Sequence, residues 1–259
     1  MLGLSQAGYI DKILARFSMQ NSKKGLRPLR HGVPLSDDQR PKTLEEEKTI
    51  RQVPYASTVG SLIYALLCTT PDIYYSIGIV SRYQSNPEPK HWEAIKHILK
   101  YLRRTRDYML VYRCEDLIPI DYTDSDFQSD LDFKKSTSGC EFTLGGEAIS
   151  WRSVKQSCIA DSTMEVEYVV ACETAKEAVW LKKFHSDLSV VRMEQVPITL
   201  FCDNSGVVTQ SKDPRNHKKE KHIERKYHII LDIVARGDVV AAKIDSTNNL
   251  ADPFTKVLP

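Results

Sequence analysis

The sequence predicts an α/β fold for residues 113–259, a mixed five-stranded sheet flanked by helices, with a mainly helical region before it at residues 1–112. Three stretches within residues 118–151 alternate apolar and polar residues and are joined by short turns, which is typical of antiparallel strands. Two more strand-like stretches follow, separated by segments with helical periodicity. A mixed sheet with helices packed against it satisfies this order.

Helical spacing of apolar residues dominates the first region. Thr70, Pro71 and Asp72 form a helix-start signal, because a hydroxyl can cap the first turn, proline fits its first position and an acid suits its positive end. The stretch at about 21–52 is first basic and then acidic, and its prolines predict an extended surface connection. The expected helices run over about 5–19, 54–67, 71–84 and 91–104.

In the second region, strands are expected at 118–124, 140–144 and 149–151, and further strands at 198–202 and 239–244. Gly145 and Gly146 supply the turn between the second and third strands. A long helix is expected from about Ser162 to Leu188. An amphipathic helix is expected at about 223–234, and Gly237 can terminate it.

The composition is that of an ordinary globular protein. A net charge of +2 over 259 residues does not by itself indicate a partner. The six cysteines show neither zinc-type spacing nor the density of a disulfide scaffold, so reduced, packed thiols in an intracellular protein are expected. No signal peptide is expected, and Pro71 and Asp72 break the most apolar stretch, at 59–80, which argues against a membrane span.

Three acids stand at strand ends where a metal site could form. Asp124 continues the alternation of Ile120 and Tyr122 on the first strand, where a solvated acid is not expected. Asp203 directly follows the strand at 198–202, at the kind of strand end where open sheets often place ligands. Asp252 follows the last strand. Any one such acid is more often a turn or cap residue, so the prediction depends on all of them together.

A fourth acid, Glu167, lies on the long helix. It shares a stripe with Ala171 and Ala175 that is narrow enough to pack against a sheet, whereas Glu165 groups with Cys172 on a side expected to be more exposed. Magnesium prefers oxygen ligands, and two such ions about 4 Å apart can promote phosphodiester cleavage. Four acids on four different elements therefore predict a site of this kind.

Ordered motifs over nearly the whole chain resemble one known family, the C-terminal end of the Pol polyprotein of copia-type LTR retrotransposons, particularly those of plants. The motifs in the first region resemble the segment between the reverse transcriptase palm and ribonuclease H; they are Leu2-Gly3-Leu4-Ser5-Gln6, Val59-Gly60-Ser61-Leu62, Pro71-Asp72-Ile73, His91-Trp92 and Leu99-Lys100-Tyr101-Leu102. Those in the second region include Asp124-Ser125-Asp126, Lys135-Ser136-Thr137-Ser138-Gly139, Ile149-Ser150-Trp151, Glu165-Val166-Glu167-Tyr168, Cys202-Asp203-Asn204-Ser205, Lys221-His222-Ile223-Glu224 and Leu250-Ala251-Asp252-Pro253-Phe254-Thr255-Lys256.

The resemblance implies a ribonuclease H-like domain at 113–259 and a helical remnant of the reverse transcriptase thumb or connection region at 1–112. It implies that the chain cleaves the RNA strand of RNA–DNA hybrids with two Mg²⁺ or Mn²⁺ ions. The implied ligands match the four acids found by position, Asp124, Glu167, Asp203 and Asp252. The resemblance also implies an upstream polymerase palm as a partner. No paired-aspartate turn of the polymerase kind occurs in residues 1–112, so no polymerase activity is expected of this chain.

Several positions depart from the family pattern without removing an expected ligand. Asp121 stands where glycine usually precedes the aromatic residue, and Thr70 and Phe127 replace the usual arginine and tryptophan. Val166 and Val170 replace small residues beside Glu167, and their bulk could displace the helix from the sheet. Such drift is typical of a decaying or partial element.

The expected substrate contacts lie in two places, directly after Asp203 and at the start of the amphipathic helix. Lysine and arginine neutralise backbone phosphates, so a basic stretch at 216–228 predicts a phosphate-contacting edge, although an ordinary solvated helix start explains the charge equally well. Its histidines match no zinc spacing. The candidate substrate-binding residues are Asn204, Ser205, Lys221, His222 and Arg225.

Two other functions are compatible with the sequence. The chain could be an inactive retrotransposon remnant that at most binds nucleic acid, or a nuclease of the same fold acting on DNA, like an integrase or resolvase. The family motifs favour hybrid cleavage over both. The expected location is intracellular, either cytoplasmic, in a retrotransposon particle, or nuclear.

Overall fold

The computed structural model describes residues 1–32, 35–36, 43–113, 117–188, 196–212 and 221–258, without the side chains of residues 46, 49 and 221–227. These residues form two compact units, each described by itself. The helical unit comprises Leu2–Val111, Leu131–Phe133 and Lys256–Pro259; the sheet unit comprises Tyr112–Asp130 and Lys134–Thr255 together with Met1.

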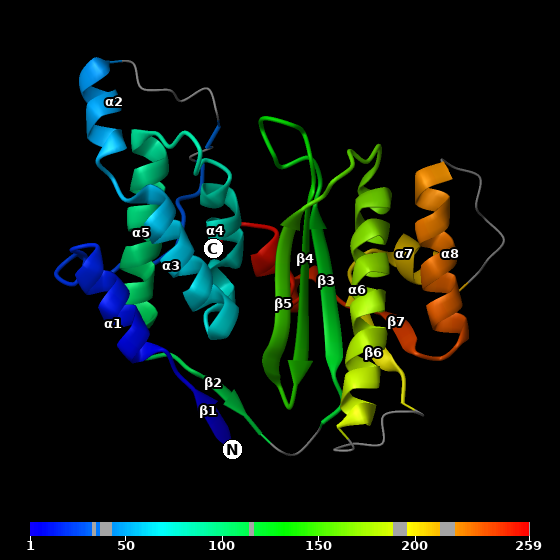
Figure 1. Cartoon of the computed structure of the whole chain (residues 1–259). Helices are drawn as coiled ribbons and strands as arrows, with labels where there is room; N and C mark the ends of the chain where they lie inside the picture. Colours follow the sequence, from blue (N-terminus) through cyan, green and yellow to red (C-terminus); the bar gives the residue numbers. More distant parts are fainter. Residues whose placement is uncertain (33–34, 37–42, 114–116, 189–195, 213–220, 259) are drawn as a thin grey trace. The chain divides into compact units, whose positions relative to one another are not determined.

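The helical unit is built from five α-helices, and most of its core comes from three of them. Ile95, Ile98, Leu99 and Leu102 of one helix are fully buried and spaced so that they share a face. The helices are α1 (Ala7–Arg16), α2 (Leu44–Arg51), α3 (Tyr55–Cys68), α4 (Tyr74–Ser81) and α5 (Pro89–Thr105), and a short strand β1 (Leu2–Leu4) pairs with β2 (Leu110–Tyr112) (Figure 1).

Two local predictions in this region need correction. The connection expected at 21–52 contains α2 in its last part, because Leu44, the glutamates that follow it and Lys48 are good helix formers. The start signal at Thr70 does not open an α-helix directly. Pro71–Ile73 forms a 3-10 turn, Thr70 makes no capping hydrogen bond with its side chain, and α4 follows.

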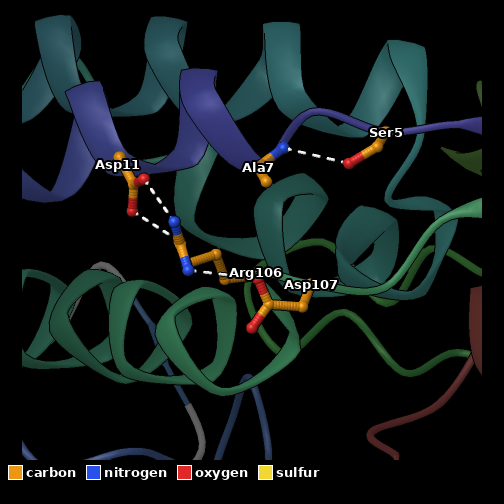
Figure 2. A network of polar contacts seen from close by, with 5 residues as sticks. All are labelled: Ser5, Ala7, Asp11, Arg106 and Asp107. Atoms are coloured by element: carbon orange, nitrogen blue, oxygen red, sulfur yellow. Dashed lines mark hydrogen bonds and ion pairs between the residues drawn. The ribbon is translucent and has the colours of Figure 1, made fainter.

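An ion-pair network joins the first and last helices of this unit (Figure 2). Arg106, just after α5, donates to both carboxylate oxygens of Asp11 in α1 at 2.6 and 2.7 Å and to Asp107 at 3.1 Å. The guanidinium lowers the pKa of Asp11 by hydrogen bonding to its charged form. Because both partners are largely exposed, the network contributes little to stability.

The sheet unit confirms the predicted fold class. Its five strands are ordered β5-β4-β3-β6-β7; the first three in the chain pair antiparallel, and β6 and β7 pair parallel to β3 and β6, respectively. The strands are β3 (Ile120–Asp126), β4 (Thr137–Leu144), β5 (Glu147–Lys155), β6 (Ile198–Cys202) and β7 (Val239–Lys243), and the helices are α6 (Thr163–Asp187), α7 (Ser205–Gln210) and α8 (Lys221–Ala235).

The long helix α6 packs along the sheet with its expected small-residue stripe buried. Ser162 caps the helix by accepting from the Glu165 N–H at 3.3 Å, and Glu167, Ala171 and Ala175 are at most 7% exposed. The prediction that Glu165 and Cys172 lie on an exposed side is wrong. Both are buried. Residues before the helix fold back on Glu165, where the Asp161 N–H donates to its carboxylate at 2.8 Å.

The described residues show the environment of five cysteines and the character of the helices. Cys140, Cys172 and Cys202 are buried free thiols, and Cys68 and Cys158 are half-buried free thiols; Cys114 lies outside the described residues. Within the described part of the chain, no helix combines the length and the apolar character needed to cross a bilayer.

Strand β3 is buried on the face opposite to the one predicted. Asp121 and Thr123 are 0% exposed, whereas Ile120 and Tyr122 are half-buried. Neither oxygen of Asp121 has a hydrogen-bond partner of good geometry among the described residues, although the Tyr122 N–H lies close enough to lower its pKa slightly. Complete burial and the nearby Glu177 charge of α6 nevertheless raise the pKa of Asp121 well above its usual range.

Replacing Asp121 is therefore expected to stabilise the protein. The folded protein binds the Asp121 proton more tightly than the unfolded chain does, so stability falls as pH rises above about 4, by up to about 1.4 kcal/mol per pH unit. Asp121→Val removes both this slope and the unpartnered polar group, and we expect a gain of about 1–3 kcal/mol at pH 8. Thermal unfolding at pH 5 and pH 8 measures it.

Asp121→Asn is the matched control, since it cannot ionise but stays polar. It is expected to flatten the pH slope without the full gain in stability. Equal pH slopes for the wild type and Asp121→Val would show that the buried carboxyl is not what titrates.

Candidate metal centre

Two of the predicted acids meet because β3 and β6 are parallel neighbours. Thr123 is the register partner of Cys202, so the next residues along the two strands, Asp124 and Asp203, come to the same edge of the sheet. Asp124 is 3% exposed and Asp203 is half-buried. The carboxyl ends of parallel strands are the usual place for ligands in open sheets.

Glu167 reaches the same edge from α6. One oxygen of Glu167, one of Asp203 and the sulfur of Cys202 all lie within 4.8 Å of one another. Cys202 was not expected here, because a cysteine at the end of an apolar strand reads as a core residue. The only signal in the sequence was its position directly before Asp203.

Asp124 is covered from its own side of the sheet by the C-terminal turn segment, residues 249–255. The Thr255 hydroxyl donates to the Asp124 carboxylate. Asp124 is the register partner of Gly139 in β4, and Gly139 is the partner of Ser153 in β5, so the three form a row across the sheet. Ser153 donates to the Phe254 carbonyl at 2.5 Å. The segment therefore lies across this row and places Thr255 on Asp124.

Asn249 fixes the other end of this segment. Its side-chain amide donates to the Thr123 carbonyl at 2.8 Å, and its carbonyl accepts from the Ala251 N–H at 3.1 Å. Asp252 opens the 3-10 turn of the segment and is half-buried. Asp252 therefore lies one turn before Thr255, whose hydroxyl contacts Asp124. Among the described residues, neither the Asp252 carboxylate nor that of Asp124 is one of the three ligand atoms that group within 4.8 Å.

The electrostatics of the site favour a bound cation. Burial, followed by the charges of Asp124 and Asp203, raises the pKa of Glu167 to about 8, while hydrogen bonds from Ser125 oppose the shift. A divalent cation would offset this mutual repulsion, and carboxylate oxygens are the ligands that Mg²⁺ and Mn²⁺ prefer. The donor set therefore fits the expected ions.

Two further residues that sequence reasoning missed surround Asp203. Ser246, after β7, donates to the Asp203 carboxylate at 2.8 Å. Lys243, the last residue of β7, donates to the Ser205 hydroxyl. Lys243 is the register partner of Cys202, the residue before Asp203, and its exposed charge is open to solvent. Nothing local in the sequence distinguishes these two residues from ordinary surface positions.

The predicted substrate-binding residues have different outcomes. The Asn204 side-chain oxygen accepts from the N–H groups of Gly206 and Val207 at 2.9 and 3.3 Å, so it caps α7 and the side-chain amide nitrogen remains for a ligand. Ser205 lies beside Lys243, as above. Lys221, His222 and Arg225 belong to the first turns of α8, but their side chains lie outside the described residues.

Thr255→Val is expected to weaken metal binding, because it removes the hydroxyl that orients Asp124 and keeps a similar volume. Loss of a hydrogen bond to a ligand typically costs about 10–100-fold in metal affinity. Titration calorimetry with Mn²⁺ measures the change. Thr174→Val is the control, since that buried hydroxyl donates to the Val170 carbonyl within α6 and is not a partner of Asp124. Equal Mn²⁺ affinities in the two variants would contradict a role for Thr255.

Comparison with known proteins places the chain in a family. No family model matches it. It is 44% identical over 258 residues to the retrovirus-related Pol polyprotein from transposon TNT 1-94 of Nicotiana tabacum, an alignment of 100% of this chain with 19% of that protein. It is 32% identical over 259 residues to the retrovirus-related Pol polyprotein from transposon RE2 of Arabidopsis thaliana, covering 99% of this chain and 17% of that protein. The chain thus spans about a fifth of these relatives.

Solved structures match at lower identity. The foamy viral protease-reverse transcriptase in complex with dsDNA is 14% identical, covers 80% of this chain and 42% of its own, and has a TM-score of 0.51. The LC11-RNase H1, isolated from compost, is 19% identical and covers 54% of this chain and 92% of its own, with a TM-score of 0.41. At these identities the likeness is one of fold alone. From its alignment with relatives along its whole length, this chain belongs to the retrovirus-related Pol polyproteins of plant copia-type transposons, and its mixed sheet flanked by helices is ribonuclease H-like.

Proposed function

We propose that the sheet unit is a ribonuclease H-type endonuclease that cleaves the RNA strand of RNA–DNA hybrids by metal-assisted hydrolysis. The observation that carries the proposal is the convergence of Glu167 and Asp203 to a tight group, with Asp124 on the neighbouring strand. A cluster of acids from three elements at one sheet edge is the donor set that a two-metal phosphodiester site needs. Nothing in an ordinary capping role requires Glu167 and Asp203 to lie so close together.

Asp124, Glu167, Asp203 and Asp252 would hold two Mg²⁺ or Mn²⁺ ions. When bound, such ions supply an activated water and stabilise the leaving 3′-oxygen, which yields 5′-phosphate and 3′-hydroxyl ends. The chain itself orients the acids: Thr255 holds the Asp124 carboxylate and Ser246 holds that of Asp203.

Lys243 and the start of α8 would bind the nucleic-acid backbone. Lys243 is exposed beside Ser205, so its ammonium can meet a phosphate at the edge of the acid cluster. The predicted contacts Asn204, Ser205, Lys221, His222 and Arg225 stay part of this proposal. Selecting RNA requires contact with a 2′-hydroxyl, and the Ser205 hydroxyl and Asn204 amide have the right chemistry.

The whole chain tests the proposal directly. Labelled RNA–DNA hybrid, duplex RNA and duplex DNA of one sequence are incubated with Mg²⁺, with Mn²⁺ or with a chelator. We expect cleavage of the RNA strand of the hybrid alone, and its loss with the chelator. Cleavage of duplex DNA instead would identify a DNA nuclease of this fold. This alternative function is worth testing because the foamy viral protease-reverse transcriptase is in complex with dsDNA. No cleavage by folded protein would favour an inactive remnant.

We propose that the helical unit is the remnant of a reverse transcriptase thumb or connection region, and that an upstream palm domain is its partner. Its apolar residues Tyr64 and Leu67 lie three positions apart on α3 and are 55% and 60% exposed, so they offer apolar side chains on which a partner could pack. We also propose that the protein acts inside the cell, in a retrotransposon particle or the nucleus. Enhanced cleavage on adding a palm domain would support this pairing.

A further inference from the structure

We infer that Cys202 is a sulfur ligand of the metal centre and that it lets the site capture thiophilic divalent cations, such as Zn²⁺, Cd²⁺ and Co²⁺. The inference rests on the proposed metal site and adds a ligand to it. Magnesium has little affinity for sulfur, so a nuclease site of oxygen donors has no use for a thiol. The presence of one among the acids therefore points to a second, softer class of cation.

The Cys202 side chain is directed at the acids by the sheet. Cys202 ends β6, is 0% exposed and lies against α6, where its sulfur is 3.9 Å from the Glu167 carboxylate. The Asn204 N–H donates to this sulfur at 3.4 Å. Burial and the Glu167 charge raise the pKa of the Cys202 thiol to about 12, and the Asn204 N–H opposes this rise, so a bound metal must displace the thiol proton. Strand pairing on both sides of β6 holds the position of Cys202, so the thiol cannot turn to the opposite face.

The distances suit a single ion. At a tetrahedral angle, a Zn–S bond of about 2.3 Å and a Zn–O bond of about 2.0–2.2 Å place the sulfur and the oxygen about 3.6 Å apart. The sulfur of Cys202 and the oxygen of Glu167 are 3.9 Å apart, so a small movement of either side chain brings them to this separation. An oxygen of Asp203 lies within 4.8 Å of both the Cys202 sulfur and the Glu167 oxygen. A small rotation of the half-buried Asp203 side chain can shorten these two distances.

This ligand set has a defined consequence for the proposed nuclease. Binding exchanges the thiol proton for a metal–sulfur bond and releases that proton to water. One thiolate and two carboxylates leave a fourth position of a tetrahedral ion for water. Such an ion would occupy Glu167 and Asp203, so thiophilic cations and Mg²⁺ should compete for the site.

Co²⁺ and Cd²⁺ titrations of the whole chain test the inference, because only a sulfur ligand gives a sulfur-to-metal charge-transfer band in the ultraviolet. We expect the wild type to show a saturable band that excess Mg²⁺ weakens. Cys202→Ser should lose the Mg²⁺-sensitive part of the band. Cys158→Ser, a half-buried thiol of the same unit, should keep it. A Mg²⁺-sensitive band of wild-type size in Cys202→Ser would overturn the inference.

Two further measurements keep the test decisive. If Cys202→Ser does not fold, X-ray absorption of the wild type with one equivalent of Zn²⁺ replaces it; one sulfur with oxygens supports the inference, and an all-oxygen shell overturns it. Hybrid cleavage in Mg²⁺ is assayed separately. A band without cleavage would contradict the nuclease proposal and leave the sulfur ligand standing, while cleavage without a band would do the reverse.

Discussion

Asp124→Asn should abolish metal-dependent cleavage, with a loss of at least about a hundredfold, equivalent to about 2.7 kcal/mol of barrier. Asp124 lies 3% exposed on the central strand of the sheet, and its charge is felt by Glu167. A neutral amide cannot replace the carboxylate as a ligand for hard cations. The same change removes one of the charges that raise the pKa of Glu167, so the metal-free protein should be no less stable.

Two measurements separate loss of metal binding from loss of folding. Mg²⁺ at a hundred times its Kd stabilises a protein that it binds by about 2.7 kcal/mol, so the wild type should melt later in Mg²⁺ and Asp124→Asn should not. Asp126→Asn is the control, as an acid of the same strand that is only half-buried. Wild-type cleavage by Asp124→Asn would refute the assignment of this residue.

Gly139→Ala should disrupt the metal site although Gly139 itself has no side chain. A Cβ at this position would lie 2.8 Å from the Phe254 Cβ, 2.8 Å from the Thr255 Cγ2 and 3.0 Å from the Ala251 carbonyl oxygen. Backbone and Cβ atoms cannot rotate away, so the C-terminal turn segment must shift. Overpacking of this kind costs about 1–3 kcal/mol, and the shift would also move the Thr255 hydroxyl from Asp124, which should reduce cleavage by about tenfold or more.

Gly60→Ala is the matched control for this change. Gly60 lies in α3, where an added methyl group meets nothing within 4 Å, and alanine is the better helix former by about 1 kcal/mol. This variant should retain cleavage and lose no stability. Unchanged melting and cleavage in Gly139→Ala would show that the segment does not depend on close contact with β4.

The sequence by itself determined the order of the elements, the fold class and the positions of the candidate acids. These features are local: alternation marks β4 and β6, a hydroxyl cap at Ser162 marks the start of α6, and Gly237 ends α8 with a positive φ of 76°. The stripe that contains Glu167 was also readable, since helical periodicity fixes which residues share a face.

Only the tertiary structure decided which side of β3 is more deeply buried and why Asp124 is covered. Alternation shows that two faces differ, but not what packs on each, and here the completely buried face carries Asp121. Asp124 is covered by Thr255, 131 residues away in the chain. Cys202 contacts Glu167, which is 35 residues away in the chain, and Ser246 donates to Asp203, which is 43 residues away. Such contacts depend on strand order and register, which arise from packing of the whole domain and leave no periodic trace in the sequence.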